Sequence, residues 1–111
     1  MLTYAIVMFG IAAFGGATLA YLRFARKSIP LPLAIIHGFF AATGLVLLTL
    51  GTMRVDRRGI AAALIIYFIA AIGGFTLFSF QLRSRPLPIP LVLIHGAVAV
   101  TAFITSLLNV V

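Results

Sequence analysis

The chain contains no cysteine and only one acidic side chain, Asp56. The lack of cysteine excludes a disulfide framework, a thioether-attached haem and a thiolate metal site. A single carboxylate, expected in a loop, leaves no paired acid and base for hydrolysis, so we do not expect the chain to be an enzyme by itself. We expect Asp56 to act locally, as a helix cap or as a partner of a neighbouring arginine.

Charged residues of either sign are also scarce, at 8%, whereas hydrophobic residues make up 64% of the chain and the mean hydropathy is +1.30. This composition excludes an ordinary soluble domain and predicts a multi-pass membrane protein, which we place in a bacterial inner membrane. All eight basic residues lie between apolar runs. Such clusters usually meet the anionic headgroups of the lipid bilayer, so we predict no nucleic-acid partner.

Four apolar runs predict membrane spans at about 1–22, 31–53, 59–82 and 88–109. Together they fill 1–111 as a single transmembrane domain, and we expect an all-α four-helix bundle. The first run resembles a signal peptide in length, but it has no basic start and its glycine pair recurs later, so we interpret it as a permanent span. Prolines in the segments 28–32 and 86–90 are expected to end one helix and begin the next.

The two halves of the chain match each other without a gap at a constant offset of 58 residues, which we call the repeat offset. We interpret it as two tandem two-helix repeats, about 1–53 and 59–111. Two repeats of two spans cross the membrane in the same sense, so we expect a pseudo-twofold axis along the membrane normal. The matching positions include Pro30 to Gly38 with Pro88 to Gly96, and Gly15-Gly16 with Gly73-Gly74.

His37 and His95 are the two histidines of the chain, and they are separated by this same repeat offset. Equivalent residues lie at equal depth, so we expect the two imidazoles to face each other inside the bundle. An intramembrane ionisable residue is a functional hypothesis by default. Glycines near the same depth are expected to leave clearance for a flat ligand: Gly15, Gly16, Gly38, Gly73, Gly74 and Gly96.

This layer suggests one b-type haem with His37 and His95 as its two axial iron ligands. Both axial positions would then be filled, which favours electron transfer over oxygen activation. The haem propionates need cations, which Arg23, Arg26, Arg83 and Arg85 offer, with Lys27, on the side nearer the histidines. A quinone, other membrane subunits and further copies of the chain are candidate partners.

Four spans with inward His-Gly pairs resemble the small four-helix membrane cytochromes b, the b561-like group in particular. That resemblance implies haem ligated inside a helical bundle. The b561-like group typically uses four histidines for two haems, so two histidines imply at most one haem here. This single-haem stoichiometry is closer to the membrane anchor of succinate dehydrogenase, with which we find no shared motif. The Pro-x-Pro-Leu-x-x-x-His-Gly run is also similar to runs in small bacterial membrane proteins, which implies no function.

A second hypothesis is a non-catalytic accessory subunit of a larger membrane complex. In that role each histidine joins two helices through one hydrogen bond, worth about 1 kcal/mol. A zinc, copper or proton pathway is a third, although two imidazoles are too few for a structural zinc site. We expect four threonines to bond back to their own helices rather than to an imidazole, and three tyrosines to lie in interfacial belts: Thr18, Thr43, Thr76 and Thr101, and Tyr4, Tyr21 and Tyr67.

The orientation in the membrane follows from the basic residues of the loops. The two loops inside the repeats carry five of them, Arg23, Arg26, Lys27, Arg83 and Arg85, against three in the central loop. We therefore predict the loops inside the repeats, and the histidine layer with them, on the cytoplasmic side. Both termini are then outside.

Overall fold

The computed structural model describes residues 1–55 and 57–110, so the role expected of Asp56 lies outside the described residues. This part of the chain contains four helices and no strand, which confirms the predicted all-α class. The helices are α1 (Leu2–Phe24), α2 (Leu31–Thr52), α3 (Arg58–Leu82) and α4 (Ile89–Val110). We call α1 with α2 the first hairpin, and α3 with α4 the second hairpin.

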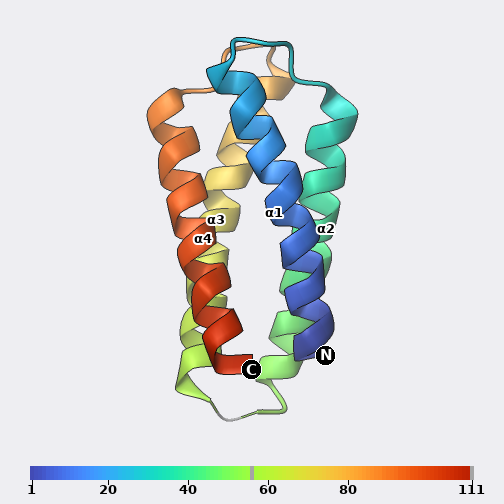
Figure 1. Cartoon of the computed structure of the whole chain (residues 1–111), viewed down its shortest axis with the longest axis vertical. Coiled ribbons are helices and arrows are strands. Elements are labelled where there is room, and N and C mark those ends of the chain that lie inside the picture. The colour runs from blue at the N-terminus through green and yellow to red at the C-terminus, as the bar shows by residue number, and fades with distance from the viewer. Residues whose placement is uncertain (56, 111) are drawn as a thin grey trace.

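The four helices run side by side in an elongated bundle of 43 × 23 × 20 Å (Figure 1). Each helix packs against the next one in the chain, and α4 closes the ring by packing against α1. The helices α1 and α3 therefore stand on one diagonal of the bundle, and α2 and α4 on the other. Both chain ends and the α2–α3 connection lie at one end of the bundle, which we call the termini end (Figure 1). The connections 25–30 and 83–88 lie at the other, which we call the basic end.

All four helices are long and apolar enough to cross a membrane. Their 22 to 25 residues correspond to about 33–38 Å at about 1.5 Å per residue, against a hydrocarbon core of about 30 Å. Large apolar side chains cover the outside of the bundle, as at Phe14, Phe75 and Leu108, which are 75–81% exposed. A bundle that is apolar outside as well as inside is typical of helices that pack within lipid.

Small residues and two aromatic rings form the inner faces of α1 and α3. Phe9 and Tyr67 stack on each other, with ring centroids 3.7 Å apart and planes 8° from parallel. The prediction that Tyr67 lies in an interfacial belt is therefore wrong, because its side chain is only 6% exposed in the middle of the bundle. The buried residues of α1 are Ala5, Phe9 and Ala12, and their counterparts Ala63, Tyr67 and Ala70 are buried on α3, which also buries Ile60 and Leu77.

The two connections at the basic end have the same backbone geometry. The first contains Arg26 at φ 56° and the second contains Ser84 at φ 54°, both in the left-handed region. In each case the next N–H bonds back into the last turn of the preceding helix, at 2.8 Å after α1 and 2.9 Å after α3. This Schellman arrangement ends a helix sharply. The α2 helix then begins at Leu31, directly after Pro30, as the proline pattern predicts.

Candidate functional site: the paired histidines

His37 on α2 and His95 on α4 approach each other across the diagonal of the bundle. Their ring centroids lie 6.5 Å apart and the ring planes are nearly perpendicular, at 89°. Both side chains are half-buried. The structure thus brings together the two residues that the repeat pattern selects as candidate metal ligands.

Each imidazole is fixed by a hydrogen bond to the first helix of its own hairpin. The Nδ1 atom of His37 lies 2.8 Å from the carbonyl oxygen of Ala12, and that of His95 lies 2.8 Å from the carbonyl oxygen of Ala70. A carbonyl oxygen only accepts, so Nδ1–H donates in both bonds. In a neutral imidazole the lone pair then belongs to Nε2, which is the atom available to a metal.

Two glycine pairs make room for the imidazoles. A Cβ atom added to Gly16 would lie 3.0 Å from Cε1 of His37, and one added to Gly74 would lie 3.1 Å from Cε1 of His95. Their neighbours Gly15 and Gly73 also face the rings, at 3.4 Å for the nearest atom. These four glycines therefore let each histidine approach the neighbouring helix closely enough to reach a backbone carbonyl.

The other two glycines of the predicted set have a different environment. A Cβ atom added to Gly38 or to Gly96 would meet nothing within 4 Å. These glycines follow the histidines in sequence but do not contact the rings. The sequence predicts Gly38 and Gly96 together with the pairs that face the imidazoles only because they are adjacent to the histidines in the chain.

The arginines predicted to bind propionates differ in position. Arg23, in the last turn of α1, is half-buried, and its Nε–H donates to the carbonyl oxygen of Leu87 in the second hairpin, at 2.7 Å. Arg83 instead bonds to Ser79 on its own helix. Arg26 and Arg85 are exposed in the connections. Only Arg23, of these four, reaches across to the other hairpin through a hydrogen bond of the described residues.

The threonines near the histidines do not bond to the imidazoles. The hydroxyl groups of all four donate to the carbonyl oxygen four residues earlier, at 2.8–2.9 Å, which confirms the prediction for them. They are Thr18, Thr43, Thr76 and Thr101. The partners that fix the imidazoles are backbone carbonyls, which no side-chain pattern reveals. The carbonyls of Ala12 and Ala70 are separated by the repeat offset, but this is recognised only once the hydrogen bonds are known.

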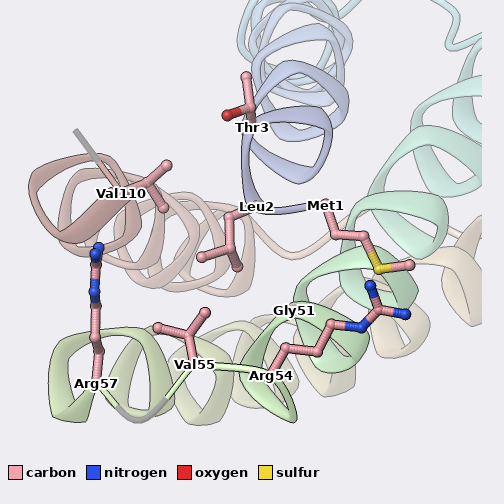
Figure 2. A pocket seen from close by; sticks show the side chains of 8 residues that line it. All are labelled: Met1, Leu2, Thr3, Gly51, Arg54, Val55, Arg57 and Val110. Atoms are coloured by element: carbon pink, nitrogen blue, oxygen red, sulfur yellow. The ribbon is translucent and has the colours of Figure 1, made fainter.

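A separate cavity of about 330 Å³ lies at the termini end, distant from the histidines (Figure 2). Leu2 and Val55 line its middle, and Arg54 and Arg57 stand on opposite sides of it (Figure 2). Gly51, which also lines it, is fourteen residues beyond His37 on the same helix, or about 21 Å. The cavity is therefore not part of the histidine layer.

The described residues contain no group of three or more histidine, cysteine, aspartate or glutamate side chains that could hold a metal ion. A four-ligand zinc site is thus not formed by this part of the chain. The two histidines are a pair of imidazole donors close to each other. Two imidazole nitrogens at about 2 Å from one metal place the ring centroids roughly 6 Å apart, close to the 6.5 Å observed.

Comparison with known protein families, with curated proteins and with solved structures finds no match.

Proposed function

We propose that this chain is an integral membrane protein that binds one b-type haem between His37 and His95 and transfers electrons. The observation that carries the proposal is the paired imidazoles, 6.5 Å apart between centroids, each with its Nδ1 bonded to a backbone carbonyl. A haem held in this way would supply a one-electron iron couple with no open coordination position for oxygen.

The residues of the chain have distinct parts in this proposal. His37 and His95 would hold the iron through Nε2, while the Ala12 and Ala70 carbonyls fix the tautomer and the orientation of the rings. The glycine pairs at 15–16 and 73–74 leave no side-chain volume on the flanking helices at the level of the rings. An apolar bundle interior keeps water from the site.

The proposal includes two tandem repeats related by a pseudo-twofold axis along the membrane normal. A reciprocal pair of hydrogen bonds supports it. Arg23 donates to the carbonyl oxygen of Leu87, and Gln81 donates to that of Ile29, at 3.2 Å. Each donor and each acceptor is separated from its counterpart by the repeat offset, as an exchange of the two hairpins about such an axis requires.

The orientation we propose places the basic end in the cytoplasm and both termini outside. Five basic residues lie at that end against three at the other, and short cytoplasmic loops carry the excess of lysine and arginine. Because the chain has no cysteine, single cysteines introduced at Ser28 and at Thr3 test the orientation with a membrane-impermeant maleimide. Labelling of Ser28→Cys from outside intact cells would reverse the assignment.

A second candidate function is that of an accessory subunit in which the histidines only join helices. The hydrogen bonds from His37 to Ala12 and from His95 to Ala70 favour it, because each connects the two helices of one hairpin. Under this alternative Nε2 binds no metal. The same bonds serve either function, so a spectroscopic experiment is needed to separate them.

The experiment is to purify the protein in mild detergent and record visible spectra of the oxidised and the dithionite-reduced forms. We expect sharp reduced α and Soret bands that disappear completely in His37→Ala and in His95→Ala, because either change removes an axial ligand. Gly10→Ala is the matched control, since its Cβ meets nothing and Gly10 is not among the predicted site residues, so the bands should stay unchanged. A folded wild-type protein that stays colourless and does not take up added haem would leave the accessory-subunit function.

A further inference from the structure

Arg23 is a half-buried cation without an acidic partner at its end of the molecule. Its Nε–H is used by the carbonyl oxygen of Leu87, and five cationic side chains lie at or near the basic end. The described residues include no acidic side chain. Within this part of the chain no carboxylate balances Arg23, which points to an external anion.

The second hairpin shows that the hydrogen bond does not need the charge. Gln81 is the counterpart of Arg23 at the repeat offset, and it makes the equivalent bond to Ile29 with a neutral amide, at 3.2 Å. The contact between hairpins is thus made twice, once with a guanidinium and once without. Because a half-buried charge is costly without a partner, the charge at residue 23 points to a bound anion on one side only.

The position of Arg23 relates this anion to the histidine layer. Arg23 follows Gly16 by seven residues on α1, or about 10 Å, and Gly16 lies against the imidazole of His37. A carboxylate on a flexible arm at the edge of a porphyrin held by the histidines is the anionic group that the site itself supplies. A lipid phosphate offers similar oxygen chemistry from the bilayer.

We propose that Arg23 binds a porphyrin carboxylate, which fixes the cofactor in one in-plane orientation in an otherwise nearly symmetric site. This inference rests on the proposed function. It assigns the carboxylate to the side of α1, where the guanidinium offers N–H groups in a planar fork suited to two oxygens. On the opposite side Gln81 is neutral, Arg83 bonds to Ser79 of its own helix, and Arg85 is exposed in the connection. Arg26, Arg83 and Arg85 are not required.

The test compares two porphyrins that differ only in charge. Apoprotein in dodecyl maltoside, a detergent without phosphate, is titrated with haemin and with haemin dimethyl ester, whose carboxylates are blocked. In Arg23→Gln we expect haemin to bind about tenfold more weakly, the loss of one charge-assisted hydrogen bond, and the ester to bind as it does to wild type. Glutamine at this position should keep the bond to Leu87, as Gln81 keeps its own.

Two further variants separate charge from structure. Arg23→Lys retains a cation and should recover most of the haemin affinity. The exchange Arg23→Gln with Gln81→Arg moves the cation to the other hairpin and should restore haemin affinity with the cofactor turned in its plane. In reduction titrations, Arg23→Gln should lower the midpoint potential and Gln81→Arg alone should raise it, because a nearby cation disfavours the oxidised, more positive iron.

The failures are distinguishable. Equal haemin affinity in wild type and Arg23→Gln would overturn the inference and leave a lipid phosphate as the partner of the guanidinium. Equal weakening of haemin and its ester would reduce Arg23 to a structural contact between hairpins, which also overturns it. If wild-type protein bound neither porphyrin, or if His37→Ala bound haemin as tightly as wild type, the proposed function would fail together with this inference.

Discussion

The two hairpins hold their histidines in the same way but differ where they meet each other. The bond from Nδ1 to a carbonyl oxygen, the glycine pair under the ring and the left-handed residue after the first helix recur in both. Some of the residues that cross between the hairpins do not recur. Phe9 stacks on its counterpart Tyr67, and Arg23 and its counterpart Gln81 each donate to the opposite hairpin.

The two kinds of contact differ in geometry. Contacts inside a hairpin involve different positions, so both copies can keep the same residues. At the contact between hairpins, equivalent side chains meet each other near the middle of the bundle, as Phe9 meets Tyr67. His37 and His95 also meet there and are identical. The unlike residues give a nearly symmetric site two different sides.

The largest effect on stability is expected from the glycines under the rings. Gly16→Ala and Gly74→Ala place a Cβ 3.0 and 3.1 Å from an imidazole carbon, so either should lower the free energy of unfolding by about 1–3 kcal/mol. Circular dichroism during unfolding in mixed detergent and dodecyl sulfate micelles measures it. The controls Gly38→Ala and Gly96→Ala meet nothing and should not destabilise. A cost at Gly38 equal to that at Gly16 would contradict the packing described.

An unequal effect is expected from exchanging the stacked rings, comparable to that of the glycines at Phe9 and smaller at Tyr67. Tyr67 donates to the hydroxyl of Ser106, 3.4 Å away, since the hydrogen of Ser106 goes to a carbonyl oxygen. Tyr67→Phe should therefore cost less than about 1 kcal/mol. The residue equivalent to Ser106 is the buried Leu48, so Phe9→Tyr leaves a hydroxyl without that partner and should cost about 1–3 kcal/mol. Equal costs in the same unfolding assay would remove this distinction between the hairpins.

The smallest effect is expected at the left-handed residues of the basic end, with the opposite sign. Ser84 adopts φ 54° without being glycine, so Ser84→Gly should raise the free energy of unfolding by about 1 kcal/mol. Arg26→Gly should give a similar gain in the first hairpin. Ser28→Gly is the control, because Ser28 has no positive φ and added chain entropy should weaken it slightly. A loss of stability in Ser84→Gly would show that the left-handed conformation of Ser84 is not strained.

Much of the fold could be predicted because it follows from hydrophobicity and from the residues that end and begin the helices. Four long apolar runs separated by basic and proline-containing segments leave an all-helical bundle as the structure that satisfies its backbone hydrogen bonds. The ungapped match of the two halves places His37 and His95 at equal depth. In the folded bundle their ring centroids lie 6.5 Å apart, which agrees with that equal position.

The inward faces of the helices could not be predicted with the same success. Helices that are apolar on every side carry little contrast between the inward and the lipid-facing side. For that reason Tyr67 was expected in a belt although it lies in the core. The sequence predicts Gly38 and Gly96 with the glycines under the rings because each follows a histidine, although a Cβ atom at either would meet nothing within 4 Å.

The helices, their order and the level of the two histidines along the bundle follow from local hydrophobicity and from spacing along one chain. Long-range packing is needed to show that Ala12 and Ala70 orient the imidazoles, that Phe9 stacks on Tyr67 and that Arg23 crosses to the other hairpin. These contacts join segments distant in the chain. They depend on the rotation of each helix about its axis, which close packing of small residues sets.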